Sequence, residues 1–350
     1  MTSPSDRLQR TFYIAGLGVL VTACLWLASA YLVPIAIAIF AYLLINAFSA
    51  SLRRAPVIGA MLPRWLAKLF AIVALFALIS LSVRVIVDNV AELGSGVPDG
   101  QGVLLEKFEA IIAQLGVDLG LTPQDVFDRL EVDRVIGWAL GVAQGLISDV
   151  SLVFLYVLFL LIDERFYDQK LRALFPDPAR RQGLEVSIRR IGNEVRLYLW
   201  LMTLVSLGVA IMTFIACRVT GVNGAGFWAF LAFGLNFVPT IGSITAVVLP
   251  AVFGVLTLED PTQLAVLIAI LAATQFVAGE IVLPRLMGDR LNLSSFVILL
   301  TLVVWGALWG PAGMFMAIPI TVSLTMIAAR FEATRPIAIA LSKDGQIPDG

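Results

Sequence analysis

The residues best suited to chemistry lie at positions 234–242, which read Gly-Leu-Asn-Phe-Val-Pro-Thr-Ile-Gly. This stretch interrupts residues 227–258, an apolar run without any charged side chain. The amide of Asn236 can donate and accept hydrogen bonds, which suits a polar solute or, through its carbonyl oxygen, a cation. Pro239 and Gly242 predict a break in the helix here, because proline lacks the amide hydrogen and glycine leaves helical geometry at low cost. The alternative is a proline-kinked span in which Asn236 hydrogen-bonds to a neighbouring helix.

A carboxylate follows the next uncharged run. Glu280 adjoins residues 262–279, and an acid at membrane depth commonly belongs to a proton or cation pathway. The alternative is a carboxylate at the membrane surface that pairs with Arg285. Gln275 lies about 140° round a regular helix from Glu280. The two side chains therefore converge only if the helix is irregular there, and otherwise Gln275 makes a hydrogen bond between helices.

Further candidates are prolines that bend a helix and glycines that interrupt it or let another helix approach closely. Pro284 is more typical of a kink than of a binding residue, and Gly310 and Gly313 interrupt a second apolar run at residues 294–329. Small residues let membrane helices approach closely. The full set of candidate pathway residues is Asn236, Pro239, Gly242, Gln275, Glu280, Pro284, Arg285, Gly288, Gly310 and Gly313.

The composition excludes several kinds of chemistry. The chain contains no histidine, so it has no imidazole base, no Ser-His-Asp triad and no histidine-ligated metal. Cys24 and Cys217 both fall in apolar stretches and are expected to pack as small apolar residues. No Gly-x-x-x-x-Gly-Lys-Ser/Thr loop is present. We therefore expect a protein that is not an enzyme, with no cofactor and no metal.

The elements that must hold these candidates are membrane helices. Of 350 residues, 59% are hydrophobic and 14% charged, against about 25% charged in soluble domains. Apolar stretches predict about six full spans, at residues 12–30, 32–48, 66–87, 146–162, 197–219 and 262–279. The runs at 227–258 and 294–329 predict two broken or re-entrant helical hairpins. The expected fold class is an all-α polytopic membrane protein.

The charged segments divide the chain further. Residues 88–145 form an acidic insert with helical spacing of apolar residues, and residues 146–196 combine the fourth span with a basic amphipathic helix. The predicted divisions are helices 1–3 at 1–87, the insert at 88–145, the basic segment at 146–196, a transport core at 197–330 and a tail at 331–350. We expect the tail to be disordered.

The distribution of lysine and arginine predicts the orientation in the membrane. Basic residues gather near both termini, at 53–68 and at 163–196, which puts these segments and both termini in the cytoplasm. The acidic insert then faces outward. The net charge of −1 gives no reason to expect a nucleic-acid partner, and membrane lipid is the expected surrounding.

The order of the motifs resembles the AI-2E family of transporters, also called the AI-2 exporter or PerM/YdiK-like permease family. The matching pieces are residues 236–242, Pro250, Gln275, Glu280, the Val-Leu-Pro-Arg-Leu-Met-Gly of residues 282–288, the Gly-Pro-Ala-Gly of residues 310–313, and Ile318-Pro319. One departure is Ile281, where similar members often have asparagine after the acid.

This resemblance implies a secondary transporter of the bacterial inner membrane. It would either export a small polar molecule, such as an autoinducer-2-like signal, or act as an antiporter coupled to protons or Na+. The resemblance also implies a homo-oligomer, for which a pentamer is the candidate. A passive channel using the same hairpins, or a non-transporting scaffold with the acidic insert as its partner surface, remain the alternatives.

Overall fold

The computed structural model describes residues 4–54, 62–95, 150–287 and 292–345. Within these residues the chain is mostly helical, with short turns between helices, and has no strand apart from an isolated β-bridge between Leu293 and Ser342. The named helices are α1 (Pro4–Leu27), α2 (Ser29–Arg54), α3 (Arg64–Ser95), α7 (Tyr167–Leu174), α8 (Pro178–Thr220), α9 (Ala225–Leu235), α10 (Ile241–Thr257), α11 (Pro261–Phe276), α12 (Leu283–Met287), α13 (Ser295–Ala328) and α14 (Arg335–Leu341).

Several of these helices have the length and apolar composition of membrane spans. Among the described residues, four helical stretches are long and apolar enough to cross it: Ser29–Arg54, Arg181–Thr220, Pro261–Met287 and Ser295–Ala328. Helices α9 and α10 are apolar but shorter than the roughly 20 residues that a span requires. The protein is therefore an all-α membrane protein, and the number of full spans stays a prediction.

The chain folds into two compact units. One comprises Met1–Leu44, Ser151–Arg196 and Leu291–Gly350, and the other comprises Ile45–Val150 and Leu197–Arg290. We call these the terminal unit and the hairpin unit. Helices α2 and α8 each contribute to both units, since each runs across a boundary in the sequence.

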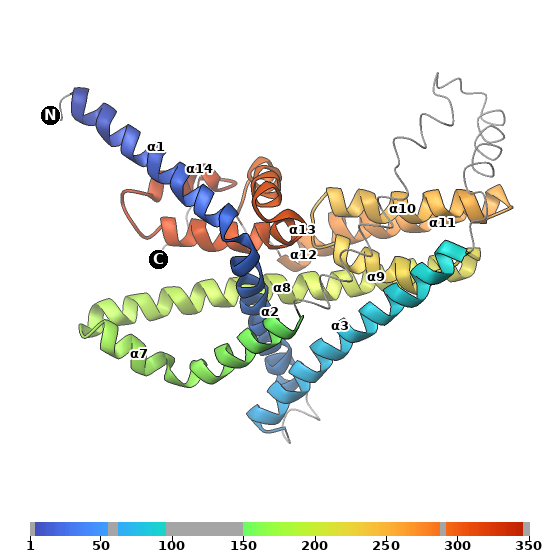
Figure 1. Cartoon of the computed structure of the whole chain (residues 1–350), viewed down its shortest axis with the longest axis horizontal. Helices are drawn as coiled ribbons and strands as arrows, with labels where there is room; N and C mark the ends of the chain where they lie inside the picture. Colours follow the sequence, from blue (N-terminus) through green and yellow to red (C-terminus); the bar gives the residue numbers. More distant parts are fainter. Residues whose placement is uncertain (1–3, 55–61, 96–149, 288–291, 346–350) are drawn as a thin grey trace. The chain divides into compact units, whose positions relative to one another are not determined.

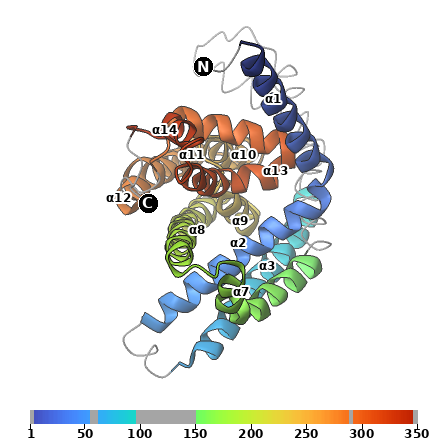
Figure 2. The ribbon, with the colours of Figure 1, turned by 90° about the vertical axis from the view of Figure 1, so that its left-hand side faces the viewer.

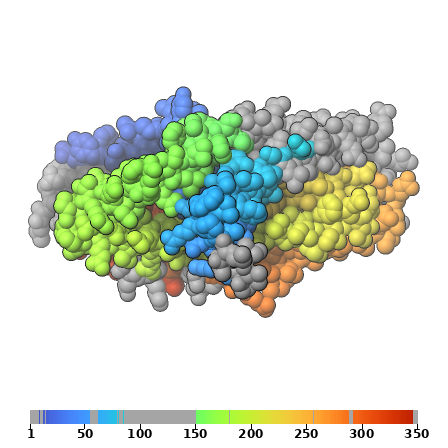
Figure 3. Space-filling model, turned by 90° about the horizontal axis from the view of Figure 1, so that it is seen from below, coloured from blue at the N-terminus to red at the C-terminus, as the bar shows by residue number. Residues whose placement is uncertain are grey.

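The hairpin unit is organised around the C-terminal part of α8 and the helices that follow it (Figure 1). Cys217 of α8, Trp228 of α9 and Leu267 of α11 are buried in one apolar core. Helix α3 packs along α9, and their side chains lie next to each other in Figure 3, in blue and yellow. Burial of these aromatic and aliphatic side chains against each other fixes α9 on α8.

The terminal unit contains α13, with α1 and α14 packed against it (Figure 2). The indole nitrogen of Trp309 donates a hydrogen bond to the Leu25 carbonyl oxygen of α1, at 3.0 Å. At the far end of α13, the Arg330 guanidinium donates to the Gly183 carbonyl oxygen of α8, at 2.6 Å.

The expectation of a disordered tail is wrong for residues 335–345. Helix α14 begins next to Pro336, a residue favoured in the first helical turn, and its apolar Ala338 is fully buried. Two backbone bonds fasten its end to the start of α13, from Ser294 to Leu341 and from Lys343 to Asn292. Ile337 and Ile339 stay exposed, so the small Ala338 and the backbone bonds hold this segment in place.

Candidate functional site

The helix breaks where Pro239 and Gly242 predict it. Helix α9 ends at Leu235 and α10 begins at Ile241. Between them the Ile241 amide donates to the Pro239 carbonyl oxygen at 2.7 Å, forming a three-residue turn. Its central residue, Thr240, has φ 64° and ψ −63°. A β-branched residue in this region is strained by about 1–3 kcal/mol, and such strain is concentrated at functional sites.

Gly242 is fixed by the tightness of this break. A Cβ atom at this position would collide with the Leu235 carbonyl oxygen and would also press on the Val238 side chain. The carbonyl belongs to the backbone at the end of α9 and cannot rotate away. Glycine is therefore needed here for close approach of two backbone segments, and Gly234, where a Cβ would meet nothing, is not constrained in this way.

Asn236 lies in the break and is 8% exposed. Its Nδ2 donates a hydrogen bond to the Ser206 hydroxyl of α8, at 2.9 Å, so a buried amide joins the end of α9 to the neighbouring helix. Ser206 was not among the predicted residues. A hydroxyl inside the apolar run of residues 197–219 was the available signal.

A cluster of small apolar residues lies on the same helices. Val205 and Val209 of α8, Ala232 of α9, Ala246 of α10 and Ala278 form one buried cluster. Ala278 belongs to the segment η2 (Val277–Val282) between α11 and α12. The break and the segment that carries Glu280 therefore pack against the same stretch of α8.

Segment η2 is a π-helix, in which each carbonyl bonds to the fifth residue onward. The Leu283 amide, for example, donates to the Ala278 carbonyl oxygen. Pro284 explains the irregularity, because it has no amide hydrogen for the Glu280 carbonyl and its ring would crowd that oxygen in a regular helix. The irregular helix that convergence of Gln275 and Glu280 requires is thus present.

The side chains of Gln275 and Glu280 nevertheless differ in surroundings. The Gln275 Oε1 atom is buried and has no hydrogen-bond partner among the described residues, whereas Glu280 is exposed. Arg285 and Pro284 are also exposed, and no ion pair joins Arg285 to Glu280 in the part of the chain that the structure describes. Gly288 lies outside the described residues.

The second break lies in the terminal unit, within α13. Gly310 has φ 61° and ψ −146°, a backbone conformation essentially restricted to glycine. A Cβ atom on Gly313 would collide with the Trp305 carbonyl oxygen. The two predicted glycines thus repeat the plan of the first break, in which a glycine passes against a backbone carbonyl from the preceding arm.

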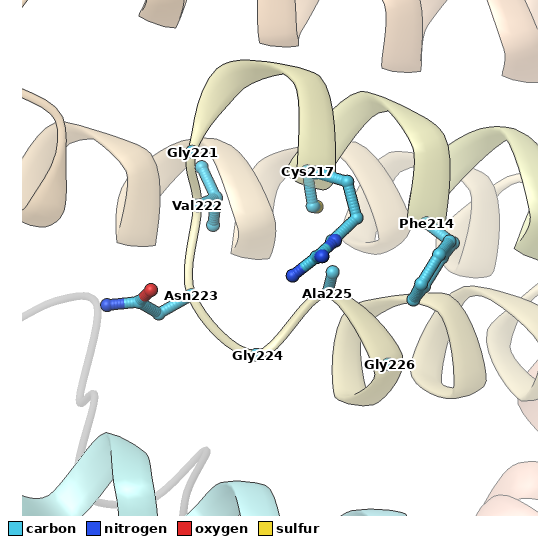
Figure 4. Close-up of a pocket in the computed structure, with 9 residues that line it drawn as sticks. Phe214, Cys217, Gly221, Val222, Asn223, Gly224, Ala225 and Gly226 are labelled. Carbon is cyan, nitrogen blue, oxygen red and sulfur yellow. The ribbon is translucent and has the colours of Figure 1, made fainter.

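A cavity of about 320 Å3 lies at the turn between α8 and α9, away from the predicted residues (Figure 4). Its lining includes Phe214, Cys217 and Arg218 of α8 and Gly221 and Asn223 of the turn. An arginine at the end of an apolar span, followed by Asn-Gly, was the sequence signal for it. No group of three potential metal ligands occurs among the described residues.

Broken apolar helices that bury a polar side chain are typical of membrane transport proteins. The fold and the break thus define a multi-pass membrane protein of the transporter class. The chain belongs to the AI-2E family of transporters, because the model of the AI-2E family transporter matches residues 16–332.

Several curated relatives carry transport names. The AI-2 transport protein TqsA of Escherichia coli (strain K12) is 26% identical over 338 residues, covering 93% of this chain and 94% of that protein. A putative transport protein of Haemophilus influenzae is 28% identical over 328 residues, 91% of each chain. The putative transport protein YhhT of E. coli K12 is 31% identical over 209 residues, and the match spans 58% of YhhT.

Proposed function

We propose that this protein is a secondary transporter of the bacterial inner membrane that moves a small polar solute past Asn236. The observation that carries the proposal is the buried Asn236–Ser206 hydrogen bond, 2.9 Å long, beside the strained turn at Thr240. A helix break at membrane depth is tolerated where it is buried in protein or lines a watery cavity, and polar side chains at such breaks often belong to a transport site. Both termini face the cytoplasm in this proposal.

Glu280 is the proposed coupling residue for a proton or for Na+. It is an exposed carboxylate on a π-helical segment, and π-helical turns are frequent at functional sites. Coupling requires only that Glu280 bind the ion differently in two states of the protein, because a ligand shifts an equilibrium by its differential affinity. Segment η2 packs on the same cluster as the break, so movement of one reaches the other.

Autoinducer-2 is the first solute to test, because TqsA is named for its transport, and export is the proposed direction. The proposed form in the membrane is a homo-oligomer, with a pentamer as the candidate, surrounded by lipid. We propose that the protein uses no cofactor and catalyses no reaction.

The test compares solute flux into proteoliposomes for Asn236→Ala and Ser206→Ala. Each variant removes the same hydrogen bond, which contributes on average about 0.6 kcal/mol between membrane helices, so both should lose similar thermal stability. If Asn236 also contacts the solute, Asn236→Ala should lose most of its flux and Ser206→Ala should retain more. Asn193→Ala, an exposed asparagine elsewhere on α8, is the matched control. Equal flux in the Asn236 and Ser206 variants would show that the pair only joins helices.

A further inference from the structure

Helix α8 carries a row of polar side chains on its buried face. Ser206, Thr213 and Thr220 are 0%, 1% and 2% exposed and are spaced seven residues apart, so they stay on one side of the helix with about 20° of drift per step. Tyr198 lies eight residues before Ser206, and its buried hydroxyl has no hydrogen-bond partner in the described part of the chain. We call these four residues the α8 polar row.

The α8 polar row is as long as a membrane is thick. At about 1.5 Å per residue, the rise from Tyr198 to Thr220 is about 33 Å, against about 30 Å for the hydrocarbon core. Serine and threonine also occur where membrane helices pack together, so the bonds that the row residues make are needed to separate packing from a pathway.

Adhesion between helices accounts for only part of the row. Ser206 accepts the bond from Asn236. Thr220 instead donates to the Ala216 carbonyl oxygen of its own helix, at 2.8 Å, and the Tyr198 hydroxyl meets no partner among the described residues. Helix α9 covers the row between the turn and the break, since Leu231 and Ala232 are buried in the clusters that contain Cys217 and Val209 of α8.

The last residue of the row, Thr220, directly precedes Gly221, which lines the cavity between α8 and α9. Arg218 and Asn223 border this cavity, and no carboxylate is among the described residues that line it (Figure 4). Arg218 forms no ion pair within the described chain. A cavity bordered by one sign of charge raises the local concentration of the opposite ion.

We propose that the α8 polar row is one wall of the solute pathway, covered by α9 in this structure, and that the Arg218 cavity is its mouth. The mouth selects small anionic solutes over cationic ones. The pathway rests on the proposed transport function and adds its route and its charge preference.

The test measures modification of cysteines placed on α8 in proteoliposomes. Thr213→Cys and Ser206→Cys lie in the row, and Met212→Cys and Leu207→Cys are their exposed apolar neighbours. Two methanethiosulfonate reagents are used, one with a sulfonate and one with a trimethylammonium group. Peptide mass spectrometry reads each introduced cysteine separately from Cys24 and Cys217.

When the pathway opens to water during transport, the row positions should react at least about tenfold faster than their neighbours, because only a thiolate reacts and it forms in water but not in lipid. The sulfonate reagent should be preferred, and Arg218→Gln should remove that preference while Arg218→Lys keeps it. Thr213→Cys and Ser206→Cys reacting no faster than their neighbours would overturn the pathway. An unchanged reagent preference in Arg218→Gln would overturn the selection at the mouth.

Flux of autoinducer-2 through the unsubstituted protein in the same vesicles separates the transport proposal from the pathway proposal. Normal flux with unreactive row positions would overturn this route and leave the transport function standing. Absent flux would contradict the transport function, and with it the pathway that rests on it.

Discussion

At the scale of single residues, the two breaks depend on glycines that lie against backbone carbonyls. Gly242 faces the Leu235 carbonyl and Gly313 faces the Trp305 carbonyl, in different units. A helix break was predicted at both positions, because glycine disrupts a helix and permits close approach of two backbone segments. Which carbonyl lies against each glycine depends on how the preceding arm folds back. The pattern of apolar residues does not predict this.

Replacing Gly242 with alanine should destabilise the hairpin unit. The added methyl group meets a backbone carbonyl that cannot rotate away, and overpacking of this kind costs about 1–3 kcal/mol. The melting temperature in detergent and the solute flux should both fall. Gly234→Ala is the matched control, since its methyl group would meet nothing within 4 Å. Equal melting temperatures for the two variants would show that the break relaxes freely.

Glu280→Gln should abolish the dependence of flux on a proton gradient. Glutamine keeps the size of the side chain but cannot bind or release a proton, so the two states of the transporter no longer differ in proton affinity. Expression and oligomer size should not change. Glu259→Gln makes the same substitution at an exposed acid in the turn before α11 and should leave the response intact. A full gradient response in Glu280→Gln would remove Glu280 from the coupling mechanism.

At the scale of elements, apolar length predicted that the chain is helical, and Pro239 predicted where one helix breaks. The break between α9 and α10 follows from the sequence. So does α8, one long helix that joins the basic segment to the fifth predicted span. The π-helical winding of η2 could not be predicted, because it depends on which amide replaces the one that Pro284 lacks. Ser206 was missed because one hydroxyl in an apolar span is usually bonded to its own helix.

Deleting Gly279 should remove the extra residue of the π-helical turn, although Pro284 still interrupts the helix. A π-helical turn contains one residue more than the α-helical turn it replaces, and Gly279 is exposed, with nothing within 4 Å of an added Cβ. The protein should still insert, but its flux should no longer respond to a proton gradient because Glu280 is rotated relative to α11. The control, Gly279→Ala, should keep its response, since it leaves the length unchanged. An intact response in the deletion variant would show that the winding has no role in coupling.

At the scale of the whole molecule, the distribution of charge makes a prediction about sidedness. Cysteines at Asp99 and Asp125 should react with membrane-impermeant thiol reagents applied to intact cells, whereas cysteines at Arg53 and Arg180 should not. The physical reason is the retention of lysine- and arginine-rich loops on the cytoplasmic side. Labelling of the arginine positions alone would reverse the proposed orientation of the protein.

If this AI-2E family member is a coupled transporter, a proton gradient should drive its solute against a concentration difference. The most direct measurement is the concentration of the probe solute inside proteoliposomes after a proton gradient is imposed across the membrane. We expect the solute to accumulate above its bath concentration, and the accumulation to reverse when a protonophore collapses the gradient. Equal concentrations on both sides, reached with or without the gradient, would identify a passive channel and contradict coupled transport. Absence of any flux would contradict transport altogether.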